Sequence, residues 1–125
     1  MLEIGLTAQS HTTATQSNSA LALGSGDMNV FATPAMVALM ENAAMMAVSP
    51  ALESGQSTVG VEITTSHLKP SAMGAEITAT ATLVAIDKRM LTFKVEAHEG
   101  KALLGEGTHK RCIIDRERFL QKLLG

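Results

Sequence analysis

One long apolar segment limits what this chain can fold into more than any other feature. Residues 30–48 read VFATPAMVALMENAAMMAV, and Glu41 is the only charged residue among these nineteen. Thr33 is a favourable N-cap for a helix, and Pro34 suits the first helical position. The Ser-Pro pair at 49–50 should end the helix, because a residue before proline avoids helical geometry. We therefore expect one long helix that the rest of the chain largely buries.

After this helix the hydrophobic pattern changes to a period of two. Four segments alternate in this way, at residues 58–67, 75–86, 90–98 and 102–114. Such alternation is typical of strands with one buried face, and hairpin-length turns join the last three segments. These three strands should form an antiparallel meander. We also expect an edge strand within residues 6–22, where alternation is weaker, and a short amphipathic helix from Asp115.

The alternation also predicts which residues face the helix. In the strand after the helix, one face carries Val59, Val61, Ile63, Thr65 and His67. In the following strand, the inward face carries Ile77, Ala79, Ala81, Leu83 and Ala85. The opposite faces are rich in polar residues, so we expect both of these sets to lie against the helix.

One strand, one long helix and four further strands predict an α+β layer that occupies residues 1–125 as a single domain. An antiparallel sheet of about five strands wrapped on one central helix, with a short C-terminal helix, is the hotdog fold. The strand after the helix should lie at an edge of the sheet. Because an uncovered edge invites pairing, we expect a second copy to cover it in a homodimer, or in a pair of such dimers.

Composition argues against several classes of function. The net charge is −2 and the only aromatic residues are three Phe, so the basic stripe and stacking platforms of nucleic-acid binding are missing. No signal peptide and no membrane-spanning segment are predicted. Cys112 is the only cysteine, which favours the reducing cytoplasm. No spacing of His, Cys, Asp or Glu matches a metal site, and no cofactor is expected.

Glu41 needs a physical explanation, because its neighbours one helical turn away are all apolar: Val37, Ala38, Ala44 and Met45. Burying an unpaired carboxylate is costly, so Glu41 must be paired, solvated in a cleft or protonated. A carboxylate in a mostly apolar pocket titrates nearer neutrality, where a general base works well. The alternative is an ordinary carboxylate on an exposed stripe of the helix, beside Asn42.

Two further residues could act with Glu41. His67 ends the strand after the helix, on the face that should look toward it, although it could also be a structural histidine bonded to backbone. Thr33 marks the helix N-terminus, where free backbone N–H groups and the positive dipole end can hold an oxyanion. Thr33 and Glu41 are roughly 12 Å apart along the helix axis. In a dimer, one subunit could supply the helix N-terminus and the other the carboxylate. His109 and Cys112 fall on opposite faces of their strand and do not form a nucleophile–base pair.

Three segments resemble one known family, the hotdog thioesterases grouped with fluoroacetyl-CoA thioesterase. They are FATPAMVALMENAA, STVGVEITTSHLKPSAMG and GEGTHKRCIIDRERF, and they occur in the family's order. The similarity covers nearly the whole chain, from about Leu2 to Phe119. The resemblance implies an acyl-CoA thioesterase that releases free acid and CoA. It also implies that two subunits form one continuous sheet, with active sites at their interface.

The resemblance assigns roles to individual residues. The family has a Thr before the helix, a Glu eight residues later and a His at the end of the next strand, which correspond here to Thr33, Glu41 and His67. Glu41 would activate water or attack the carbonyl carbon, His67 would exchange protons with the leaving thiolate or orient Glu41, and Thr33 would polarise the carbonyl. The resemblance further implies that the backbone of Gly60 holds the substrate and that Arg111 lies near the pocket.

The region before the helix departs from the family pattern. Fluoroacetyl-specific enzymes carry bulky aromatic residues in this lid region, whereas here it reads LALGSGDMNV with only Phe31 nearby. We therefore assign Phe31 to substrate binding and expect a small or aryl acyl group. Three alternatives stay open: a non-catalytic acyl-CoA-binding hotdog domain, a hydratase of enoyl thioesters and a structural dimerisation module. The hydratase is disfavoured because the helix has no histidine.

Overall fold

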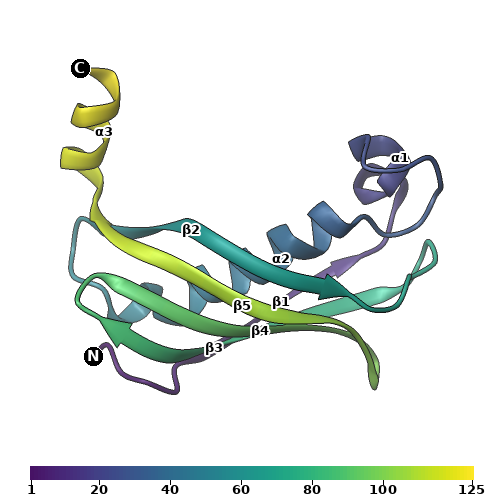
Figure 1. Ribbon diagram of the computed structural model, residues 1–125, viewed down its shortest axis with the longest axis horizontal. Helices are drawn as coiled ribbons and strands as arrows, with labels where there is room; N and C mark the ends of the chain where they lie inside the picture. The colour runs from purple at the N-terminus through teal and green to yellow at the C-terminus, as the bar shows by residue number, and fades with distance from the viewer.

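The computed structural model describes every residue, Met1–Gly125, and has an antiparallel sheet curled around one long helix (Figure 1). This helix, α2, spans Thr33–Val48. The strands are β1 (Thr7–Thr13), β2 (Gln56–His67), β3 (Glu76–Asp87), β4 (Met90–Glu99) and β5 (Ala102–Asp115). A short helix, α1 (Ala20–Leu23), lies before α2 and was not predicted, and α3 (Arg116–Leu124) projects from the end of β5. The predicted α+β hotdog arrangement is confirmed.

The five strands follow the order β1-β3-β4-β5-β2, and every neighbouring pair is antiparallel. The predicted meander of β3, β4 and β5 is therefore confirmed. Tight turns join these strands, and Lys88 and Gly100 adopt the positive φ that such turns require. β1 and β2 form the two edges, as the sequence predicts for both. Along the whole length of β2, the outer edge has no partner within the chain.

A β-bulge changes which residues of β2 face α2. The register with β5 shifts between Gly60 and Glu62, so Val61 is an extra residue on β2. The inner face, on which the helix lies, consequently carries Thr58, Gly60, Ile63, Thr65 and His67. The prediction is therefore wrong for Val59, which precedes the shift, and for Val61, which is 52% exposed. A regular period of two cannot reveal a bulge, because the extra residue reverses the alternation along the rest of the strand.

The inward faces of β3 and β4 agree with the predicted alternation except at one position. The fully buried set on β3 is Ile77, Ala79, Ala81 and Leu83, and the set on β4 is Leu91, Phe93, Val95 and Ala97. Ala85 is exposed instead of inward, because the pairing of β3 with β4 shifts between Leu83 and Ala85. The core therefore occupies the central part of the sheet.

The long helix covers only part of the inner face. Its buried side chains are Met36, Met40, Ala43, Ala44, Ala47 and Val48. α2 lies mainly over β1 and β3 and has much sparser contact with β5 and β2. At Gly105 on β5, an added Cβ would fall 2.6 Å from the sulfur of Met36, so only glycine fits this close approach. No helix combines the length and the apolar run that a bilayer crossing requires.

Candidate active site

The N-terminus of α2 forms the first part of the candidate site. The hydroxyl of Thr33 lies 2.7 Å from Nδ1 of His67, which comes from the end of β2. Both residues line a pocket of about 250 Å³, together with Ala20, Ser25, Val30, Phe31 and Pro70. Phe31 is only 1% exposed, so its phenyl ring is held by the core and forms a rigid side of the pocket. Three of the six predicted site residues therefore meet in one pocket.

The imidazole of His67, which lines this pocket, has one ring nitrogen without a hydrogen-bond partner. Burial lowers the pKa of His67 below its ordinary value of 6.5, although the backbone of Lys69 opposes the shift. Its Nε2 atom is buried and has no hydrogen-bond partner. A buried polar atom without a partner is rare in folded proteins and needs an explanation. A bound ligand that exchanges a proton with Nε2 would supply one.

The first turn of α2 offers free backbone donors beside Thr33. The N-cap is Ala32, not Thr33, so the predicted cap is wrong by one residue. Ala32 has no side-chain acceptor, and the amides of Thr33 and Ala35 donate to no group of the chain. Thr33 therefore keeps its hydroxyl for His67 instead of using it as a cap. Free amides at the positive end of a helix are suited to an oxyanion.

Glu41 and Arg111 form the second part of the candidate site, further along α2. Arg111 on β5 places its NH1 atom 3.9 Å from Oε2 of Glu41, whose side chain is 40% exposed. Of the three ways to accommodate this carboxylate, the structure therefore has two, pairing and access to solvent. Asn42 does not support Glu41, because it is bonded to Ser10 on β1. Glu41 is thus held by one cation and remains open to a ligand.

Arg111 is fixed on every side of its guanidinium. Its Nε atom donates to the hydroxyl of Thr58 at 2.8 Å, and NH2 donates to the Thr58 carbonyl at 3.0 Å. NH1 lies 3.2 Å from Nε2 of His109. The residue is 7% exposed, and burial lowers the pKa of Arg111 while Glu41 opposes the shift. We call Arg111, Thr58 and His109 the Arg111 cluster. Sequence reasoning missed Thr58 and His109, because their link to Arg111 depends on the pairing register of β2 and β5.

Gly60 provides the space that the carboxylate of Glu41 occupies. A Cβ added at Gly60 would lie 2.8 Å from Oε2 of Glu41 and 3.4 Å from NH1 of Arg111. Gly60 can face these groups because it pairs with Arg111 immediately before the bulge. The glycine is thus required for the position of Glu41, whatever its backbone contributes to substrate binding.

Replacing Gly60 with alanine is expected to reduce turnover without unfolding the protein. The added methyl group would push the flexible end of Glu41 aside, and misplacement of a reacting group by about 1 Å can cost roughly a hundredfold in rate. We expect kcat to fall about ten- to a hundredfold with little change in the melting temperature. Steady-state kinetics and thermal melting check this, with Thr108→Ala on the outer face of β5 as control. If Gly60→Ala kept the wild-type kcat, a methyl group at this position would not displace the Glu41 carboxylate, and the prediction would be wrong.

The two parts of the site are separate within one chain. No hydrogen bond or ion pair joins Glu41 to Thr33 or His67. Eight residues of helix separate Thr33 from Glu41, a distance of roughly 12 Å along the axis. Reacting groups must approach to about 3–3.5 Å, so one thioester carbonyl cannot meet both parts at once. The candidate residues therefore divide into Thr33, His67 and Phe31 on one side and Glu41, Gly60 and Arg111 on the other.

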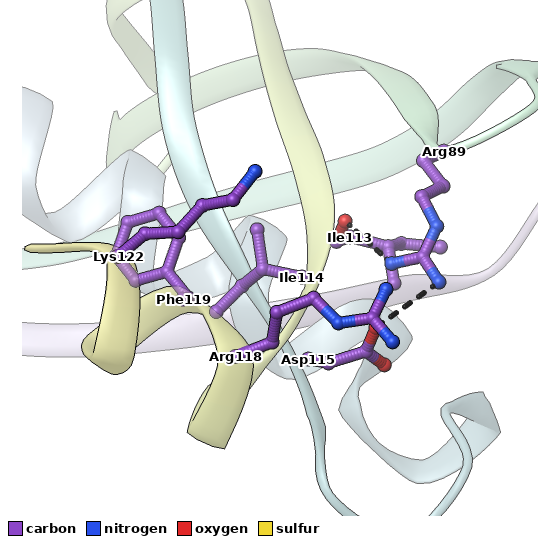
Figure 2. Close-up of a pocket in the computed structure, with 7 residues that line it drawn as sticks. All are labelled: Arg89, Ile113, Ile114, Asp115, Arg118, Phe119 and Lys122. Atoms are coloured by element: carbon purple, nitrogen blue, oxygen red, sulfur yellow. Dashed lines mark hydrogen bonds and ion pairs between the residues drawn. The ribbon is translucent and has the colours of Figure 1, made fainter.

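A different hollow, of about 300 Å³, lies where β5 continues into α3 (Figure 2). Arg89 is fixed there by the carbonyl of Ile113 at 3.2 Å and by Asp115 at 3.4 Å. Arg118 and Lys122 extend from α3 and make no ion pair. The only carboxylate in this hollow is already paired, and no predicted site residue lines it. It is therefore a cationic surface feature separate from the candidate site.

Comparisons with known proteins agree on one family. A family model described as fluoroacetyl-CoA-specific thioesterase matches residues 12–117. The fluoroacetyl-CoA thioesterase of Streptantibioticus cattleyicolor is 40% identical over 94 residues, which are 75% of this chain and 68% of that protein. A solved structure of a fluoroacetyl-CoA-specific thioesterase has a TM-score of 0.90 at 31% identity and covers 98% of this chain and 96% of its own. A thioesterase-superfamily protein of Thermus thermophilus has a TM-score of 0.88 at 25% identity, with 98% and 93% covered.

Proposed function

This chain belongs to the family of fluoroacetyl-CoA-specific thioesterases, and from this premise we propose that it hydrolyses acyl-CoA thioesters with Thr33, Glu41 and His67 in sites shared by two copies. The observation that carries the proposal is the contact of 2.7 Å between Thr33 and His67 inside a pocket. Beside this contact, Nε2 of His67 has no partner and the amides of Thr33 and Ala35 donate to no group of the chain. A thioester carbonyl placed there would find donors for its oxygen and an imidazole for the leaving group, and it would need Glu41 from a second copy.

The residues divide the chemistry between them. The helix amides and the Thr33 hydroxyl stabilise the negative charge that develops on the carbonyl oxygen. Glu41 takes a proton from water as the water oxygen attacks the carbonyl carbon, or attacks that carbon itself in a first step. The C–S bond then breaks, and the proton removed from water passes through Nε2 of His67 to the leaving thiolate. If Glu41 attacks first, water then hydrolyses the acyl–Glu41 anhydride and supplies that proton. The products are the free acid and CoA with its thiol.

A second copy would bring the two parts of the site together. β2 offers twelve residues of unpaired edge, on which Glu62 is the only charge, proline is absent and the bulge at Val61 is the one irregularity. The side of α2 that faces away from the sheet is also largely apolar, with Pro34, Ala38 and Met46 exposed. Antiparallel pairing of two β2 edges would bring the partner's copies of Thr33 and His67 toward Glu41. We therefore propose a homodimer in which each site contains Glu41 of one copy and the Thr33–His67 pair of the other.

The pocket supports a small or aryl acyl group. Its volume is about 250 Å³, which is smaller than the volume of about 300 Å³ at the lower end of the range for small-molecule sites. Phe31 closes it on one side, and the same side chain also lines a second hollow of about 260 Å³ next to Ala35 and Leu39. The segment before α2 brings no aromatic side chain near the pocket other than Phe31. Nothing in this lining is specific for fluorine.

The proposed function is tested by following free-thiol release from a panel of CoA esters with the wild-type protein. The panel contains acetyl, fluoroacetyl, branched, phenylacyl and long-chain esters. We expect turnover of small and aryl esters and little turnover of long-chain ones. Calorimetric binding of the same esters distinguishes a thioesterase from the alternative, a non-catalytic acyl-CoA-binding domain. An acyl-CoA-binding domain would show binding without thiol release for every ester, and that result would overturn the proposed hydrolysis.

A further inference from the structure

His109 is the most deeply buried ionisable residue in the chain, and no role in the reaction has been assigned to it. It is 1% exposed and lies on β5, on the face that looks toward α2. Its cross-strand neighbours are Ile63 on β2 and Phe93 on β4, and the Phe93 ring is 6.2 Å away between centroids. An ionisable group at such a site must have its polar atoms satisfied. Both ring nitrogens of His109 do have partners.

The two partners of His109 determine where its proton is. Nδ1 lies 2.8 Å from the backbone carbonyl of Glu62, which can only accept, so Nδ1 carries the hydrogen. Nε2 lies 3.2 Å from NH1 of Arg111, which can only donate, so Nε2 must be unprotonated. His109 is therefore neutral in this arrangement. If Nε2 were protonated, it could no longer accept a hydrogen bond from NH1 of Arg111. The ring would also place a second positive charge beside the guanidinium.

Burial is the main cause that favours the neutral ring, and the two charges near His109 act in opposite directions. Arg111 lies beside it on β5, and Glu41 approaches from α2. The Glu62 side chain is paired instead with Lys110, at 3.8 Å, so β2 presents only its carbonyl to the ring. Burial lowers the pKa of His109 most; the Glu62 backbone and Glu41 oppose this, whereas Arg111 adds to it.

His109 joins the bulge in β2 to the catalytic carboxylate. The Glu62 carbonyl lies immediately after the bulge, and Gly60 lies immediately before it. One line of contacts thus runs from the bulge through His109 and Arg111 to Glu41, while the Cβ position of Gly60 lies 3.3 Å from the His109 ring. Without the His109 acceptor, Thr58 would hold the guanidinium only along its Nε–NH2 edge. The rigid plane could then tilt about that edge and carry NH1, the atom next to Glu41, away from the carboxylate.

We propose that neutral His109 is a positioning residue that orients NH1 of Arg111 toward Glu41 and so fixes the carboxylate for attack. The role rests on the proposed function, because it acts on the proposed catalytic group. His109 is buried and does not line the pocket that contains Thr33 and His67. Its loss should therefore reduce kcat, while KM should change little, because neither His109 nor Arg111 lines the pocket of Thr33, His67 and Phe31.

The test compares His109→Leu with His109→Gln, whose amide can both donate to the Glu62 carbonyl and accept from Arg111. We expect kcat to fall about ten- to a hundredfold in the leucine variant, the range typical of outer-shell partners, with KM changed less than about threefold. The glutamine variant should recover most of the loss. His98→Leu on β4 is the matched control and should keep wild-type kcat. A folded leucine variant with wild-type kcat, or a glutamine variant as slow as the leucine one, would overturn the proposal.

A second measurement does not depend on activity. Nitrogen NMR of the histidine rings in the wild-type protein at neutral pH should show His109 neutral, with hydrogen on Nδ1 and none on Nε2. The signal is assigned by its disappearance in His109→Gln. A ring protonated at Nε2 would overturn the positioning role even if the protein is an active thioesterase. Conversely, the expected tautomer in a protein without turnover would contradict the proposed function and leave the geometry of the Arg111 cluster intact.

Discussion

Replacing Glu41 with glutamine is expected to lower kcat for acyl-CoA hydrolysis by about a hundred- to ten-thousandfold, the usual contribution of a general base. Glutamine keeps the shape of the side chain but cannot take a proton from water or attack a carbonyl. KM should change little, because Glu41 does not line the pocket that holds the acyl group, which Thr33, His67 and Phe31 of the other copy would supply. Thiol release under saturating substrate measures kcat directly.

The stability of the Glu41→Gln variant should stay close to that of the wild type. Glu41 is 40% exposed, and its contact with Arg111 is long at 3.9 Å, so solvent screens the pair. Arg111 also keeps both bonds to Thr58 and its bond to His109. Glu117→Gln on the exposed α3 is the matched control for a lost carboxylate. A Glu41→Gln enzyme that keeps more than about a tenth of wild-type kcat would exclude Glu41 as the main catalytic base.

The fold was predictable because local patterns and the global arrangement agree. An apolar helix of the length of α2 needs a sheet to bury it, and the alternating segments after it supply one. The turns between β3, β4 and β5 are short, which leaves antiparallel pairing as the only arrangement. Once β3, β4 and β5 are a meander, β1 and β2 can only add at the edges. None of these steps depends on an individual side-chain contact.

The errors arose where a single backbone irregularity decides the outcome. The bulge at Val61 reverses the alternation in β2. Gly60, an isolated glycine immediately before it, is the one local signal in the sequence that suggests a bulge there. Thr33 is a favourable N-cap by residue type, yet the helix starts one position earlier and its hydroxyl bonds His67. Sequence alone cannot decide between a cap and a tertiary partner, because the second depends on where β2 ends.

Only part of the candidate site could be predicted, because some of its residues are recognisable locally and others only from the pairing of strands. Glu41 is recognisable because a charge in an apolar helix is costly, and that argument needs no partner. The supporting residues are different. His109 and Thr58 act through Arg111 across two strands, and the sequence separations of 47 residues from Glu62 to His109 and 53 from Thr58 to Arg111 carry no periodic signal. Only the pairing of β2 with β5 shows that these side chains converge.

Two inactive variants are expected to restore each other's activity when their subunits are mixed. In the proposed homodimer, each site uses Glu41 of one copy and the Thr33–His67 pair of the other. A mixed dimer of Glu41→Gln with His67→Ala therefore has one site with every group intact and one with both replaced. Random pairing at equal amounts makes about half of the dimers mixed, so about a quarter of wild-type activity should return.

The matched control for this mixing experiment is a pair of variants on the same side of the site. In a mixed dimer of Thr33→Val with His67→Ala, one site lacks the Thr33 hydroxyl and the other lacks the His67 imidazole. Neither site is complete, so no activity should return. Subunits are exchanged by unfolding and refolding the mixture, and the dimer fraction is checked by size-exclusion chromatography. If each chain contained a complete site, mixing would return only the average of the two separate activities. That outcome, with mixed dimers present, would assign Glu41, Thr33 and His67 to one chain and require α2 to bend or the substrate to bridge roughly 12 Å.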